Sequence, residues 1–198
     1  EYYQAANATI GNGNLMITAK LESTGNEPYT SARMTTQGKE APTYGRIEAR
    51  IKVPMGPGFW PAFWMLGSNI QTVPWPGCGE LDIMEHVNDN GTIYGTMHWA
   101  INNQHSQYGS TLNVPTVADY HVYAIEWDQN EIRWYVDDTL YQTGNIKDNI
   151  NTTGAFHLPF FIILNFAMGG NFPNTPVNQS LWPATRDGEE GRVYKQTN

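Results

Sequence analysis

The sequence is poor in cysteine, in basic residues and in long apolar runs. Its single cysteine, Cys78, excludes an internal disulfide and any zinc site built from several cysteines. Eleven Lys and Arg stand against 19 Asp and Glu, a net charge of −8, which argues against a protein that tracks the phosphates of nucleic acid. No apolar run approaches the roughly 18 residues of a membrane span. We therefore expect neither nucleic acid nor a membrane as a partner.

Aromatic residues, in contrast, are abundant. Seven Trp and eleven Tyr occur among 198 residues, more than a core easily absorbs. Aromatic rings left on a concave surface form a platform for the apolar face of a sugar ring. The length suits one domain with a full core, and neither a repeat nor a flexible linker divides it, so we expect a single domain over residues 1–198. Low Lys content with many Asn, Gly, Thr and Trp favours a secreted, extracellular protein that handles polysaccharides.

Apolar and polar residues alternate with a period of two in several segments, which predicts β-strands. The clearest are Asn14–Lys20, Gly45–Val53 and Tyr120–Trp127. Glu131–Val136 and Leu140–Gln142, joined by a tight acidic turn, predict a hairpin.

Two apolar segments complete the β pattern. Phe160–Met168 is continuously apolar and predicts a strand buried on both faces, whereas Gly58–Gly67 contains a proline and is expected to pass from a strand into a loop. Because no stretch combines a helical period with caps, we expect an all-β fold, an antiparallel, bent two-sheet sandwich with a concave, Trp-lined cleft. We assign four aromatic residues to the core, namely Trp99, Trp127, Trp134 and Phe166. Four histidines are assigned surface or structural roles: His86, His105, His121 and His157.

The segment Pro74–Asn88 places three acids, Glu80, Asp82 and Glu85, on an otherwise apolar strand. Strand side chains alternate, so Glu80 and Asp82 share a face and Glu85 falls on the other. A one-residue bulge at Ile83-Met84 would return Glu85 to the first face.

Clustered acids oppose stability, because like charges raise at least one pKa and keep one carboxyl protonated near neutral pH. A protonated carboxyl beside an ionised one suits a retaining glycosidase, whose nucleophile and acid/base lie about 5–5.5 Å apart. Two alternatives remain at this point: a solvated strand edge with acids facing outward, and a metal site. Calcium ligands usually come from loops, so an apolar strand suits calcium poorly.

The phrase WPGCGELDIMEH, preceded by GFWPAFWML, closely resembles the signature of glycoside hydrolase family 16, and within it the laminarinase branch of endo-1,3-β-glucanases. Three further segments, GRIEARIKV, YAIEWDQNEIRWYV and LNFAMGG, are similar to family segments. The resemblance implies a β-jelly roll and retaining hydrolysis of 1,3-β-glucan such as laminarin. It implies Glu80 as nucleophile, Glu85 as acid/base and Asp82 as the residue that orients and tunes the nucleophile.

The resemblance also implies substrate-binding residues. His98 matches a family histidine near the acids, Trp75 matches a tryptophan that stacks under a glucosyl ring, and Arg33 matches an arginine that binds sugar hydroxyls. Trp60 and Trp64 share a face, and we favour Trp64 as the cleft member. For His98 and the two Trp the alternative is a core position, and for Arg33 it is an ordinary surface position.

Both ends of the chain depart from the family pattern. The resemblance implies an N-terminal strand that is missing or shortened here, and Asp187–Tyr194 contains poor strand formers where relatives have a closing strand. Relatives often hold a structural calcium between these terminal strands, so calcium remains possible, although no cofactor is required for the reaction and the site itself is expected to hold no metal.

Several functions remain open beside the leading one. Met84 makes the acid spacing longer than in family members that cut mixed-linkage 1,3-1,4-glucans, which disfavours that substrate. Neutral agarose is a further possibility, whereas sulfated galactans would require more Lys and Arg. The last alternative is a β-glucan-binding protein without activity. We expect a monomer that acts on a polysaccharide.

Overall fold

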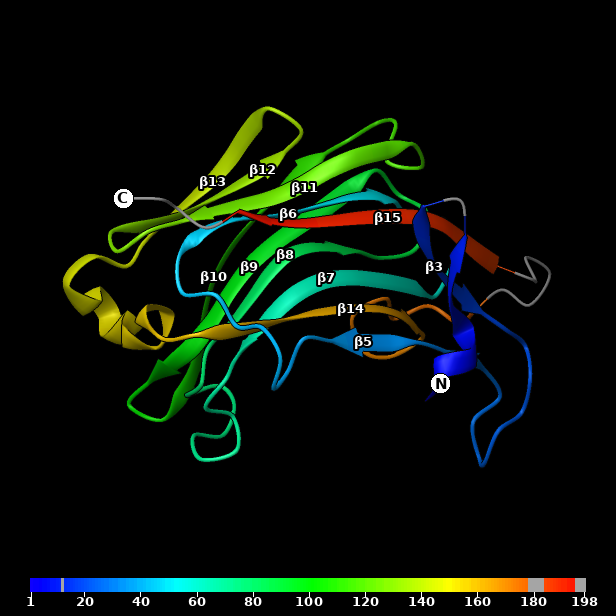
Figure 1. The fold of residues 1–198 in the computed structure, drawn as a ribbon, viewed down its shortest axis with the longest axis horizontal. Coiled ribbons are helices and arrows are strands. Elements are labelled where there is room, and N and C mark those ends of the chain that lie inside the picture. The colour runs from blue at the N-terminus through cyan, green and yellow to red at the C-terminus, as the bar shows by residue number, and fades with distance from the viewer. Residues whose placement is uncertain (12, 178–183, 195–198) are drawn as a thin grey trace.

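The structure is a computed structural model that describes residues 1–11, 13–177 and 184–194, the last segment by its backbone alone. Two large antiparallel sheets dominate the described part of the chain (Figure 1). One has six strands, in the order β10 (Gln104–Asn113), β9 (Thr92–Ile101), β8 (Glu80–His86), β7 (Phe59–Gly67), β14 (Phe160–Met168) and β5 (Arg33–Thr35). The other has seven, in the order β13 (Thr139–Asn145), β12 (Glu131–Val136), β11 (Tyr120–Trp127), β6 (Gly45–Lys52), β15 (Ala184–Tyr194), β3 (Asn14–Ala19) and β2 (Ala8–Gly11).

Small elements complete the fold. A short parallel pair joins β1 (Tyr2–Tyr3) to β4 (Thr30–Ser31). The described residues also contain two 3-10 segments, η1 (Ala5–Asn7) and the irregular η2 (Lys147–His157). No helix in the described residues is long and apolar enough to span a membrane.

The main core fills the space between the two sheets. Leu81 of β8 and Met97 of β9 belong to the same buried cluster as Ile47 of β6, Ile125 of β11 and Trp134 of β12. In β9 the odd-numbered residues 93, 97 and 99 are buried, while 94, 96 and 98 are half-buried on the opposite face. The alternation that marks these strands in the sequence therefore separates a core face from an outer face. The four aromatic side chains assigned to the core are confirmed as buried: Trp99, Trp127, Trp134 and Phe166.

The predicted all-β sandwich is confirmed, and most strand boundaries agree with the sequence patterns. The expectation that Gly58–Gly67 passes into a loop was wrong, because β7 continues through Pro61 to Gly67 and pairs with β14 over its whole length. Pairing with a buried neighbour outweighs the local preference against proline. Asp187–Tyr194 also lies within a strand, β15, which pairs with β3 and β6 and shows an irregularity between Arg186 and Glu189.

Two of the terminal strands, β2 and β3, lack carboxylate side chains. No group of three His, Cys, Asp or Glu donors lies on either of them in the described part of the chain. The side chains of β15 lie outside the described residues, so structural calcium stays a prediction and no step below depends on it.

Candidate active site

A bulge in β8 brings the three acids to one face. Toward β9, Asp82 pairs with Thr96 and Glu85 with Tyr94, so Ile83 and Met84 together face the single residue Gly95. Because Glu80 pairs with His98, the three acids lie opposite residues 98, 96 and 94, which alternate onto one face of β9. The predicted bulge at Ile83-Met84 is confirmed.

The other side chains of the bulge enter the core. Leu81, Ile83 and Met84 are all buried against the opposite sheet. Trp134 of that sheet donates its indole N–H to the backbone oxygen of Asp82 at 2.8 Å. A bulge interrupts the hydrogen-bond ladder between strands and leaves backbone groups without a strand partner. The indole of Trp134 supplies a hydrogen-bond donor to one such group from the core side.

The acids line a cleft on the outer face of the six-stranded sheet. Two adjoining cavities, of about 170 and 560 Å³, make up this cleft and share four lining residues: Trp60, Glu80, Asp82 and Glu85. The smaller cavity is also lined by Arg33, Ala62, Trp64, Asn165 and Ala167. The larger is also lined by Tyr94, Thr96, His98, Gln107 and Phe172.

Glu85 is held by a tryptophan. Trp60 donates its indole N–H to Glu85 Oε1 at 2.9 Å. Burial, and then the neighbouring Asp82 carboxyl, raise the pKa of Glu85 to about 8, while the Trp60 bond and His98 oppose the rise. A carboxyl with such a pKa carries a proton at neutral pH and is suited to donate it.

Asp82 and Glu80 surround the imidazole of His98. Asp82 is 3% exposed, and its Oδ2 lies 2.9 Å from His98 Nε2, a close contact rather than an aligned hydrogen bond. Glu80 Oε1 lies 3.9 Å from the same nitrogen. Burial raises the pKa of both carboxyls, and the charge of Asp82 raises that of Glu80 further, whereas His98 and a hydrogen bond from Trp75 lower it. Burial lowers the pKa of His98.

The remaining predicted residues surround this centre. Trp60 and Trp64 both line the cleft, and it is Trp60 that contacts an acid, whereas Trp64 donates to Asn165 Oδ1 at 2.6 Å. The Arg33 guanidinium lies over the Trp64 ring at 5.3 Å. Trp75 is 45% exposed and lies beside the histidines, with its ring centroid 6.3 Å from that of His98.

Sequence analysis did not identify several of the residues that line the cleft. Tyr94, Thr96 and Gln107 follow from strand pairing, because residues 94 and 96 face the acids and Gln107 pairs with His98. Phe172 comes from the loop after β14, and its ring packs against Trp60 at 5.5 Å and Tyr94 at 5.0 Å. No local pattern identifies that contact.

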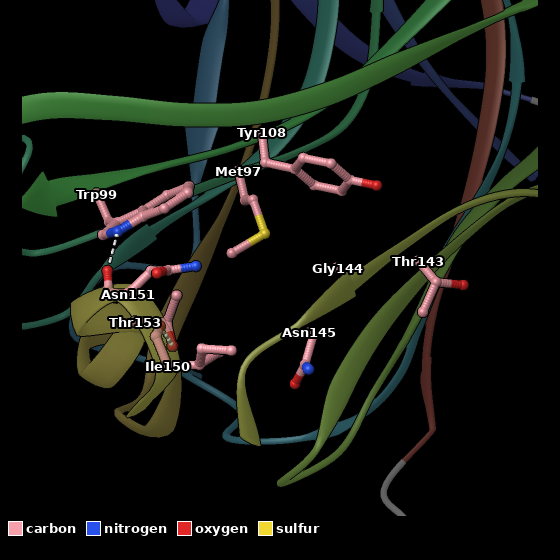
Figure 2. A pocket seen from close by; sticks show the side chains of 9 residues that line it. All are labelled: Met97, Trp99, Tyr108, Thr143, Gly144, Asn145, Ile150, Asn151 and Thr153. Atoms are coloured by element: carbon pink, nitrogen blue, oxygen red, sulfur yellow. Dashed lines mark hydrogen bonds between the residues drawn. The ribbon is translucent and has the colours of Figure 1, made fainter. Parts of the chain in front are cut away.

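A third cavity, of about 310 Å³, lies on the core side of the same sheet. Figure 2 shows Met97 and Trp99 of β9 and Tyr108 of β10 facing β13 and η2. Its lining contains neither a carboxylate nor an imidazole. Of these cavities in the described part of the chain, those around Glu80 and Glu85 contain the carboxylates and the imidazole.

Paired carboxyls with a raised pKa in an aromatic cleft are the arrangement expected of a glycoside hydrolase. Residues 2–196 match the family described as glycosyl hydrolases family 16, and the chain belongs to this family.

Individual relatives agree with this assignment. The chain is 41% identical to a β-glucanase of Rhodothermus marinus, over 98% of this chain and 73% of that protein. It is similar to the laminarinase catalytic domain of Thermotoga maritima, with a TM-score of 0.86 and 42% identity over 99% of this chain and 83% of the other. It is also 38% identical to the clotting factor G alpha subunit of Tachypleus tridentatus, over 98% of this chain but only 29% of that protein's length. The likeness across the fold confirms the predicted jelly-roll sandwich.

Proposed function

We propose that this chain hydrolyses 1,3-β-glucosidic linkages inside β-glucan chains, with retention of anomeric configuration. The observation that carries the proposal is the bulge in β8, which brings Glu80 and Glu85 into one cleft with the buried Asp82 between them. The β-glucanase and laminarinase among its relatives support the choice of linkage.

The geometry supports different roles for the two glutamates, Glu80 as nucleophile and Glu85 as acid/base. Three neighbouring carboxyls with raised pKa values do not all ionise together. We assign the charge to Glu80, whose carboxylate is stabilised by His98 and by the hydrogen bond from Trp75, and the proton to Glu85. Its carboxylate attacks the anomeric carbon and forms a glycosyl-enzyme, while Glu85 protonates the departing sugar oxygen. Glu85 then takes a proton from water, whose oxygen releases the sugar from Glu80.

Aromatic rings and one cation bind the polymer around this centre. Trp60 and Trp64 line the cleft and Trp75 stands half-exposed beside it, so that sugar faces stack on indole rings. Arg33, fixed over the Trp64 ring, donates to sugar hydroxyls.

The charge of the cleft favours a neutral polymer. Arg33 is the one Lys or Arg among the described residues that line the two cleft cavities. A sulfated galactan would meet three carboxyls there with little compensation, which supports a neutral glucan. Because such polymers are met outside cells, we also infer an extracellular site of action.

The test compares reducing-end release from laminarin, lichenan and agarose by the unaltered chain. Laminarin is expected to be cut fastest, and Glu80→Gln and Glu85→Gln are expected to lower kcat by at least about 1,000-fold while the near-UV circular dichroism stays unchanged. Asp138→Asn, at an exposed turn, is the matched control and retains activity. Rapid laminarin cleavage by either Gln variant would exclude the mechanism, and tight laminarin binding without cleavage by the unaltered chain would indicate a binding protein.

Azide rescue of the two Gln variants, with an activated aryl laminaribioside as substrate, distinguishes the nucleophile from the acid/base. In Glu80→Gln, azide replaces the missing nucleophile and gives the α-glycosyl azide, because it attacks the β-linked anomeric carbon directly. In Glu85→Gln, azide attacks the glycosyl-enzyme and gives the β-glycosyl azide. Products of the opposite configuration would exchange the assignments of the two residues.

A further inference from the structure

His105 is an exposed histidine that no sequence pattern assigns to the site. It lies on β10 and pairs with Ala100, two residues beyond His98 on the same face of β9. Its Nε2 lies 2.9 Å from His98 Nδ1, within hydrogen-bond geometry. His98 therefore has His105 on one ring nitrogen and Asp82 on the other.

We propose that His105 is a positioning residue, which donates its Nε2–H to His98 Nδ1 and so keeps the His98 proton on Nε2, toward Asp82 and Glu80. A neutral imidazole has one donor and one acceptor nitrogen, and the bond made by one nitrogen decides the state of the other. With the reverse tautomer, the unprotonated Nε2 of His98 would lie 2.9 Å from Asp82 Oδ2. Once Asp82 is ionised, two lone-pair-bearing atoms would then repel each other, and the bond from His105 excludes that arrangement.

The surroundings agree with a neutral His105. Burial and the neighbouring His98 lower the pKa of His105. The titratable groups that face the pair are Glu80, Asp82 and Glu85 of β8, and the nearby loop brings Trp75, which does not titrate. The proposal builds on the hydrolase mechanism, because the oriented N–H acts on the carboxyl next to the nucleophile.

His105 has a second neighbour, which provides the matched control. Its ring lies 4.9 Å from Trp75, inclined by 36°. His105→Phe keeps an aromatic ring beside Trp75 and removes the hydrogen bond to His98. His105→Gln removes the ring and keeps an amide N–H at about the reach of Nε2.

The first measurement uses protein with ¹⁵N-labelled histidine and needs no substrate, so it is independent of the proposed function. In the unaltered chain and in His105→Gln, His98 is expected to show an unprotonated Nδ1 and a protonated Nε2. In His105→Phe, His98 is expected to become a mixture of tautomers. The proposal is overturned if the unaltered chain carries the His98 proton on Nδ1, or if His105→Phe leaves the His98 pattern unchanged.

The second measurement is the pH profile of laminarin hydrolysis. Without the donor on Nδ1, His98 accepts a second proton more readily, and its charge lowers the pKa of Glu80 and Glu85. His105→Phe is therefore expected to lose about tenfold in kcat, with little change in KM, and to move its basic limb down by about half a pH unit. His105→Gln is expected to retain most of kcat and the original profile. Loss of activity in His105→Gln with normal activity in His105→Phe would show that stacking on Trp75 is what matters.

Discussion

At the scale of single residues, the indole of Trp60 does two things at once. Its ring lines both parts of the cleft, and its N–H reaches Glu85 Oε1. A donor to a carboxylate stabilises the ionised form, so this bond lowers a pKa that burial raises. The side chain that we propose as part of the sugar platform therefore also tunes the proposed proton donor.

Replacing Trp60 should change the pH dependence in a defined direction. In Trp60→Phe the donor is lost, so the pKa of Glu85 rises and the carboxyl keeps its proton to higher pH. The basic limb of kcat/KM, which reports the free enzyme, is expected to move upward by about one pH unit. Laminarin hydrolysis from pH 5 to pH 10 measures it.

Trp64→Phe is the control for this shift. Trp64 lines the same cleft but donates to Asn165 rather than to an acid. Binding is expected to weaken in this variant without movement of the basic limb. Equal movement in both variants would refute the assignment of the limb to the Trp60–Glu85 bond.

At the scale of elements, the bulge of β8 depends on the opposite sheet. Trp134 of β12 donates to the Asp82 carbonyl, and a Cβ on Gly95, which faces the bulge, would lie 2.7 Å from Trp134 Cδ1. Glycine at this position therefore lets the indole approach the strand next to the bulge. The orientation of Glu85 is thus supported from the core side of the sheet.

Trp134→Phe should loosen the bulge. It removes the donor, leaves a buried carbonyl without this partner and opens a small cavity, which is expected to lower Tm by about 5 °C or more. Because the acids lose their fixed spacing, kcat of the folded protein is expected to fall by about tenfold or more. Calorimetry and laminarin kinetics below the transition measure the two effects.

Trp127→Phe separates stability from catalysis. Trp127 is equally buried and donates to the Phe156 carbonyl at 3.0 Å, away from the acids. A similar loss of Tm is expected, with kcat unchanged. If both variants lose kcat alike, the bond to Asp82 has no special role in positioning the acids.

At the scale of the whole molecule, the cleft reduces stability at neutral pH. The pKa of Glu85 is raised from 4.5 to about 8 in the folded protein. Between these values the folded state binds a proton that the unfolded chain has lost, so the free energy of unfolding falls as pH rises. Burial of Glu80 and Asp82 acts in the same direction, while the lowered pKa of His98 opposes it near pH 6.5.

Glu85→Gln should therefore stabilise the protein selectively at higher pH. The gain over the unaltered chain is expected to grow by on the order of 1 kcal/mol between pH 5 and pH 8, because the variant has no proton to lose. Urea unfolding at both pH values measures it, with Asp138→Asn as an exposed control whose difference stays flat. A gain that is constant or falls with pH would contradict the sign of the Glu85 shift.

Local sequence determined the strands and the need for a bulge. Alternation predicted Tyr120–Trp127, the hairpin pattern predicted Glu131–Val136 and a continuous apolar run predicted Phe160–Met168, all with the boundaries that the structure has. A half-buried strand leaves its period in the sequence, and a strand buried on both faces leaves an apolar run. The odd spacing of Glu80 and Glu85 required a break in that period if the acids were to share a face.

What the tertiary structure alone decided is which side chains meet those acids. Trp60 reaches Glu85 because β7 pairs with β8, and Phe172, which packs on Trp60, comes from a loop 87 residues beyond Glu85 (172 − 85). His105 is an intermediate case, since Asn102 and Asn103 both have positive φ, and an Asn-Asn turn fixes the β9–β10 register. Strand pairing between distant segments depends on the whole core and leaves no local pattern, so the acids were visible in the sequence and most of their partners were not.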